Sequence, residues 1–150
     1  MSHTYTKIHI HFVFSTKGRL PLISEILRQR LYSYIGGIIK GEGGIPLRIN
    51  GTNNHIHILS VLPSDLSVSE MMRSVKSNSS RWINDLPNSR NTFGWQTGYG
   101  AFCVCNNEVD DIIHYIIGQA EHHRHVSFQE EYLELLKAHG IVYDVKYLWD

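Results

Sequence analysis

Two histidines, His55 and His57, are the residues of this sequence whose type and spacing most directly suggest chemistry. Apolar residues surround the pair, which predicts a buried strand, and side chains at i and i+2 of a strand leave the same face. Two neutral imidazoles side by side can bind a divalent cation if a third ligand comes from elsewhere. Taken alone, the spacing is more typical of two hydrogen-bonded core histidines.

Tyr115 and Gln119 are the residues that change this interpretation. They are separated by four positions in a predicted helix over about 107–124, so they are neighbours on one helix face, beside the apolar stripe. Alone, Tyr115 would be expected to pack on a sheet and Gln119 to be exposed. In the predicted fold, the helix that follows the fourth strand could bring both side chains to the histidine pair. Gly118 lies inside this helix at a cost of about 1 kcal/mol relative to Ala, which favours close packing there or a helix that must shift.

Further histidines surround this set. Ten are present, and His9 and His11 form a second pair in the predicted first strand, where polar side chains facing neighbouring strands are the simpler interpretation. His122 and His123 extend the tyrosine helix together with Arg124. These side chains could contact phosphate, or they could form a solvated helix end whose charges offset the helix dipole.

Composition limits the class of protein. The chain has 150 residues, 42% hydrophobic and 19% charged, which predicts one folded domain over residues 1–150. Neither a membrane span nor a signal peptide is recognisable, so we expect a cytoplasmic protein. Fourteen basic residues balance fourteen acidic ones, so bulk charge gives no argument for nucleic-acid binding. Cys103 and Cys105, two positions apart, are expected to be reduced thiols.

The hydrophobic periodicity predicts an α+β fold. Strands are expected over 6–15, 45–50, 53–62 and 101–105, and helices over 20–40, 67–83, 107–124 and 127–139, followed by an aromatic tail to residue 150. We expect Ser24 or a neighbouring residue to cap the first helix, and Ser67 with Glu70 to form a capping box on the second. The first six elements have the ferredoxin-like split βαβ order, an antiparallel sheet with helices on one face, here with extra C-terminal helices. In that topology the first and third strands are central, which places the histidine pair in mid-sheet.

The segment His55 to His57, taken with Tyr115 to Gln119, resembles the HUH single-tyrosine transposases of insertion sequences of the 200/605 type and their repeat-associated relatives. The likeness covers nearly the whole chain, including the segments 16–19, 95–102, 121–124, 128–132 and 147–149. The resemblance implies an enzyme that cuts and rejoins single-stranded DNA at hairpin-bearing element ends through a 5′-phosphotyrosine intermediate. Two alternatives remain open: a catalytically idle hairpin-binding protein of the same fold, and a metallo-phosphodiesterase that uses water as nucleophile.

The same resemblance implies individual roles. Tyr115 is the expected nucleophile, and His55, His57 and Gln119 are the expected ligands of a divalent cation, Mg or Mn. The resemblance also implies a single-stranded DNA hairpin as partner and a homodimer in which Tyr115 acts in its own chain or in the other one. The candidate phosphate contacts are Lys17, Arg19, Arg73, Lys76, His122, His123 and Arg124.

Overall fold

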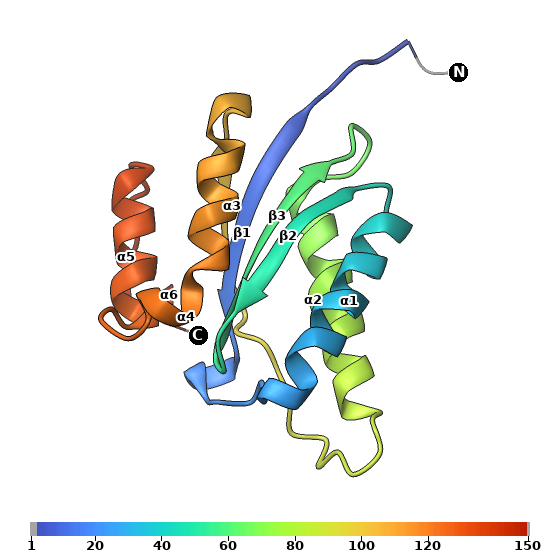
Figure 1. Cartoon of the computed structure of the whole chain (residues 1–150), viewed down its shortest axis with the longest axis vertical. Helices are drawn as coiled ribbons and strands as arrows, with labels where there is room; N and C mark the ends of the chain where they lie inside the picture. Colours follow the sequence, from blue (N-terminus) through green and yellow to red (C-terminus); the bar gives the residue numbers. More distant parts are fainter. Residues whose placement is uncertain (1–2, 150) are drawn as a thin grey trace.

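The computed structural model describes residues 3–149 and is built on a four-stranded antiparallel sheet of order β2-β3-β1-β4 (Figure 1). The strands are β1 (Ile8–Ser15), β2 (Ile45–Gly51), β3 (His55–Leu62) and β4 (Gly100–Val104). As predicted, the first and third strands are the two central ones, and they pair with each other. The histidine pair therefore begins a strand that has a neighbour on both sides.

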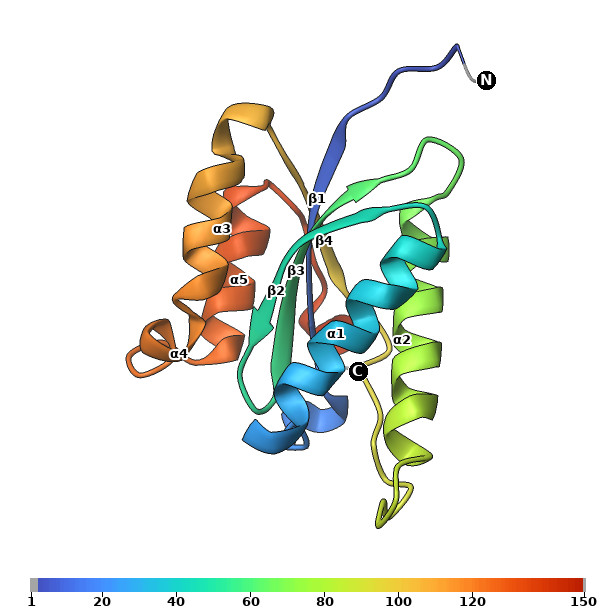
Figure 2. The same ribbon diagram turned by 45° about the vertical axis from the view of Figure 1, so that its right-hand side comes forward.

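Two long helices cover one face of the sheet. Helices α1 (Glu25–Gly41) and α2 (Val68–Asn84) lie side by side there (Figure 2). The predicted caps are confirmed, since the Ser24 side chain accepts from the backbone of Leu27, and Ser67 forms a reciprocal capping box with Glu70. The main hydrophobic core lies in this layer and includes Phe12, Phe14, Leu31, Ile35, Ile56, Ile58, Met71 and Val75.

The C-terminal helices cover the opposite face of the sheet, as Figures 1 and 2 show. They are α3 (Val109–Ile117), α4 (Gln119–His122) and α5 (Phe128–Ala138). Three shorter helical turns complete the chain: η1 (Lys17–Arg19), η2 (Asn106–Glu108) and α6 (Val145–Leu148). The predicted α+β fold is confirmed, and the extra helices add a layer on the face that the ferredoxin-like unit leaves uncovered.

Helix α5 is held on the sheet by its own apolar cluster. This second core consists of Val13, Phe102, Phe128, Tyr132 and Leu136. The C-terminal aromatic tail docks on the same cluster, since the Trp149 ring lies 6.5 Å from that of Phe128 and 5.9 Å from that of Tyr132 between centroids. Because α5 carries a buried stripe of its own, its position relative to the sheet is well defined.

The helix predicted over 107–124 is interrupted at Gly118, where the backbone has φ −82° and ψ 15°. The physical reason lies in β2: the Asn50 amide donates to the carbonyl of Ile116 at 2.9 Å and to that of Ile117 at 3.2 Å. These carbonyls would otherwise accept from the next helical turn. The competing donor and the low helix propensity of glycine together account for the break.

Cys103 and Cys105 are exposed free thiols, as predicted. Within residues 3–149, the helices lack the combination of length and hydrophobicity that crossing a bilayer requires.

The last residue of β2, Gly51, gives a test of packing beside the site. A Cβ added at Gly51 would lie 2.1 Å from the His55 carbonyl oxygen, whereas one added at Gly37, in the exposed part of α1, would meet nothing within 4 Å. We expect Gly51→Ala to lower the free energy of unfolding by roughly 1–3 kcal/mol or more. Gly37→Ala should raise it by roughly 0.5–1 kcal/mol. Urea denaturation of both variants is the measurement, and equal midpoints would contradict the expectation.

Candidate active site

Strand alternation separates the two faces of β3. The side chains of Ile56 and Ile58 enter the core under α1 and α2, whereas His55 and His57 point to the face covered by the C-terminal helices. Both histidines have no exposed surface. Buried imidazoles need hydrogen-bonding partners, and the C-terminal helices supply them.

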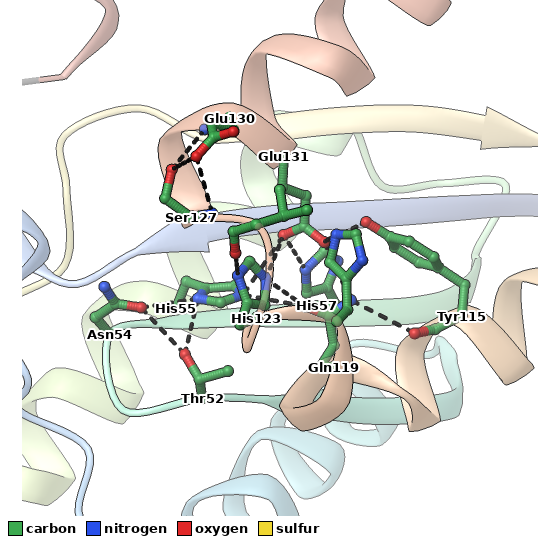
Figure 3. Close-up of polar contacts among 12 residues, drawn as sticks. Thr52, Asn54, His55, His57, Tyr115, Gln119, His123, Ser127, Glu130 and Glu131 are labelled. Carbon is green, nitrogen blue, oxygen red and sulfur yellow. Dashed lines mark hydrogen bonds and ion pairs between the residues drawn. The ribbon is translucent and has the colours of Figure 1, made fainter.

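The structure brings the four residues singled out in the sequence together within one chain (Figure 3). The Gln119 Oε1 atom lies 3.1 Å from His55 Nε2. The Tyr115 ring centroid lies 5.7 Å from that of His57, and the Tyr115 hydroxyl donates to a carboxylate oxygen of Glu131. The predicted helix thus delivers a phenol and an amide oxygen to the histidine pair.

Hydrogen bonds fix how His55 presents its lone pair. Its Nδ1 atom lies 2.8 Å from the side-chain oxygen of Asn54, which can only accept, so Nδ1 carries the proton. Neutral His55 therefore directs the Nε2 lone pair inward. The Gln119 amide nitrogen donates to Glu131 at 3.1 Å, which turns its oxygen toward that same lone pair. Two acceptors that face each other at 3.1 Å fit a cation site.

His11 contacts the site from the neighbouring central strand. Its Nε2 atom lies 2.8 Å from His57 Nδ1, and the two rings are stacked with centroids 5.1 Å apart. His11 is thus a hydrogen-bonded core histidine, the simpler of the two interpretations of the second pair, and its partner is a predicted ligand. A partner at Nδ1 orients the His57 ring so that Nε2 faces the cluster.

Glu131 is the residue that the sequence analysis missed. It is 2% exposed, lies on α5, and places Oε1 2.9 Å from His57 Nε2 and 3.1 Å from His123 Nε2. The donor atoms of His55, His57, His123 and Glu131 all lie within 4.8 Å of one another, a group that could hold a divalent cation. The helix period could have indicated that Glu131 is buried, because it follows Phe128 by three residues and so lies on the same buried stripe of α5.

The comparison with known families agrees with this geometry. Residues 4–119 match the family described as IS200-like transposases. This chain belongs to the IS200-like transposases. The matched segment contains the histidine pair, Tyr115 and Gln119, but ends before His123 and Glu131. The search of curated proteins found no match.

Two solved structures share the fold of this IS200-like transposase. One is a protein of Deinococcus radiodurans R1 described as a transposase, with 17% identity and a TM-score of 0.62, covering 79% of this chain and 95% of that one. The other is a REP-associated tyrosine transposase bound to a REP hairpin, with 18% identity and a TM-score of 0.62, covering 100% of this chain and 91% of that one. At these identities the likeness supports the fold.

Burial and charge set the protonation states of the site. Burial, reinforced by the neighbouring His57, lowers the pKa of His55 to about 3, and the same two causes lower the pKa of His11 to about 3. Burial also raises the pKa of Glu131, but its contacts with His123 and His57 outweigh that effect and hold this pKa below its ordinary value. The site therefore has one carboxylate facing at least one neutral imidazole at neutral pH.

Of the predicted basic contacts before Tyr115, two are exposed and two have hydrogen-bonding partners within the chain. Lys17 and Arg73 are exposed. Arg19 donates to the backbone carbonyl of Trp149 at 3.2 Å, and its guanidinium lies 5.1 Å from the centroid of that ring. The Lys76 ammonium donates to two loop carbonyls at 3.1 and 2.8 Å, and burial lowers its pKa to about 8. Arg19 and Lys76 thus have structural partners within the chain.

The three candidates after Gln119 also have different surroundings. His123 lies in the cluster itself, and His122 Nε2 is 3.4 Å from Glu131 Oε2. Arg124 is exposed and pairs with Glu121 at 3.4 Å. The histidines therefore face the site, whereas Arg124 faces solvent.

The lowered pKa values of His11 and His55 predict how stability depends on pH in the metal-free protein. Both are neutral when folded down to about pH 3, whereas in the unfolded chain they bind protons below 6.5. The unfolded state then binds more protons, so the free energy of unfolding falls as pH drops from 6.5, by up to about 1.4 kcal/mol per pH unit for each histidine. Urea denaturation in the presence of a chelator at pH 7, 6 and 5 measures this change in the free energy of unfolding. A His11→Asn variant should show a shallower slope, and equal stability at all three pH values would contradict the prediction.

Proposed function

We propose that this IS200-like transposase cuts and rejoins single-stranded DNA at hairpin-bearing element ends, with Tyr115 as the nucleophile. The observation that carries the proposal is the meeting of a phenol, an amide oxygen and two buried imidazoles in one chain. The REP-associated transposase with the same fold is bound to a REP hairpin, which supports a DNA hairpin as the partner. A cavity of about 170 Å³ lined in part by Tyr115 offers space beside the phenol.

The proposed cofactor is a divalent cation, Mg or Mn, held by the Nε2 atoms of His55 and His57 and by Gln119 Oε1. The fit rests on lone pairs, since Nδ1 of His55 is committed to Asn54 and Gln119 turns its oxygen to the histidine. When bound, the ion supplies positive charge that favours the phenolate and offsets charge developing on the phosphate.

Tyr115 needs such help in this environment. Burial raises the pKa of its hydroxyl, and the hydrogen bond to Glu131 and the charge of that carboxylate raise it further. The phenol is therefore protonated at neutral pH and a poor nucleophile in the ion-free protein. This requirement makes metal dependence part of the proposal.

The reaction is a balanced exchange of phosphate esters. The Tyr115 hydroxyl loses its proton and its oxygen forms a bond to phosphorus, while the bond from phosphorus to the 3′ oxygen of the preceding nucleotide breaks and that oxygen takes up a proton. The products are a 5′-phosphotyrosine and a free 3′-OH. Because the ester bond energy is kept, attack by another 3′-OH reverses the step and joins strands without ATP.

The first test uses Tyr115→Phe. We expect the wild-type protein with Mn²⁺ or Mg²⁺ and a hairpin-bearing single-stranded oligonucleotide to form adducts that survive denaturing gels. The adduct should fall below detection in Tyr115→Phe and in the presence of chelator, because the hydroxyl and the ion are both required. Tyr143→Phe, which removes an exposed phenol outside the cluster, is the matched control and should retain the adduct.

Two other outcomes would reject the proposal. Hairpin binding without an adduct under any metal would identify a catalytically idle binding protein. Cleavage that persists in Tyr115→Phe would identify a metallo-phosphodiesterase that uses water.

We further propose that Tyr115 acts within its own chain. The support is that α3 contacts β2 and β3 of the same protomer and is held there by Asn50. A homodimer, which the family resemblance implies, would then bring together two complete sites. In an exchanged arrangement, the tyrosine helix would have to leave these contacts.

Mixing two inactive variants distinguishes a tyrosine that acts within its own chain from one that acts in the partner chain. In a mixture of Tyr115→Phe and His57→Ala, no chain has both groups, so we expect no adduct beyond that of either variant alone. Because the two proteins are co-refolded before the assay, mixed dimers can form if dimers exist. Restoration of the adduct would show that the tyrosine serves the partner's histidines.

A further inference from the structure

Glu131 and His123 enter the site from the part of the chain beyond the family match. The match ends at residue 119, whereas His123 follows α4 and Glu131 lies on α5. Both side chains nevertheless lie among the proposed ligands (Figure 3). Both residues therefore lie outside the segment that matches the family model.

His123 is oriented in the way that His55 is. Its Nδ1 atom lies 2.6 Å from the backbone carbonyl of Val126, which can only accept, so Nδ1 carries the proton. Nε2 then faces Gln119 Oε1 at 3.0 Å and Glu131 Oε1 at 3.1 Å, where a bound cation would take its lone pair. A histidine whose outer nitrogen donates to a carbonyl and whose inner nitrogen faces oxygen ligands has the arrangement usual for metal-binding histidines.

Glu131 presents a buried negative charge to the same point. Its Oε1 atom lies 2.9 Å from His57 Nε2, 3.1 Å from His123 Nε2 and 3.5 Å from His55 Nε2. Ligands on adjacent corners around an ion with bonds of about 2.1 Å are separated by about 3.0–3.4 Å. Within residues 3–149 the ion pairs of Glu131 are all with histidines, which offset its charge only when they are protonated, whereas a divalent cation would offset it permanently.

The position of Glu131 is set by α5 rather than by the site. Ser127 and Glu130 cap the helix reciprocally, and Phe128 and Tyr132 anchor it in the second core on either side of Glu131. A ligand on this helix would connect the ion to the docking of α5 against the sheet.

We propose that Glu131 and His123 complete the coordination of the ion, so that the cation binds the C-terminal helix α5 to the histidine strand. The inference deepens the proposed function, because it concerns the same ion, and adds two ligands to His55, His57 and Gln119. Ion binding and the docking of α5 are then one coupled event.

The test measures Mn²⁺ affinity without DNA, by isothermal titration calorimetry and by the electron paramagnetic resonance signal of free Mn²⁺. Mn²⁺ is a suitable probe because it accepts carboxylate as well as imidazole ligands. We expect Glu131→Gln and His123→Asn each to weaken binding at least about tenfold. The matched controls are Glu134→Gln and His125→Asn, which make the same changes at exposed positions and should stay within about twofold of wild type.

A second readout follows α5 itself. Hydrogen exchange of the amides in 128–138 should slow when Mn²⁺ is added to wild type and to both controls. It should be unchanged by Mn²⁺ in Glu131→Gln, even where circular dichroism shows that this variant is folded. This comparison keeps the test decisive if Glu131→Gln is less stable, because each protein is compared with itself.

The outcomes separate this inference from the proposed function. If His55→Ala and His57→Ala abolish Mn²⁺ binding while Glu131→Gln and His123→Asn bind as tightly as their controls, the added ligands are wrong and the proposed site stands. If wild type binds no Mn²⁺, both the proposed cofactor and this inference are overturned.

Discussion

The alternation of side chains along the two central strands is the constraint on which the other features depend. In β1 and β3 every second residue enters the apolar core under α1 and α2, and the residues between them include His11, His55 and His57. These imidazoles are buried on the second face of the sheet, so the layer that covers this face must provide partners for their nitrogen atoms. The C-terminal helices are that layer. They supply Gln119 and Glu131 as partners, and the apolar residues of α5 seal them from water.

Burying a cluster of polar and charged side chains costs a small protein folding free energy. A buried carboxylate loses its favourable hydration free energy, and neutral imidazoles compensate for only part of that loss. A protein with apolar residues of similar volume in place of the cluster would therefore often be no less stable. His55 is also held in one tautomer by Asn54, and the ring of His57 is oriented by the neighbouring His11. Stability alone does not account for groups that are costly to bury and that converge on one point, and the proposed cation site does.

Much of this arrangement could be predicted from local sequence, and the remainder depended on contacts distant in the chain. Alternation and the caps at Ser24 and Ser67 are local, so the strands, the helices and the fold class followed from them. The role of Glu131 required knowing that α5 folds back over β3, which no local pattern specifies. The break at Gly118 depended on the Asn50 amide from β2. The hydrogen bonds of Lys76, a predicted phosphate contact, depended on carbonyl groups in a loop about twenty residues away.

The route of the chain explains how a line of side chains becomes an enclosed site. Tyr115, Gln119 and His123 follow one another at steps of four, so they form a row along α3 and α4 despite the break. A row alone would contact the histidine pair from one side only. The turn at 123–127 reverses the chain, and α5 returns with Glu131 on the face that meets the row, within hydrogen-bonding distance of both its ends. The phenol, the amide, the imidazoles and the carboxylate thereby surround one point, which a single helix packed on the sheet could not achieve.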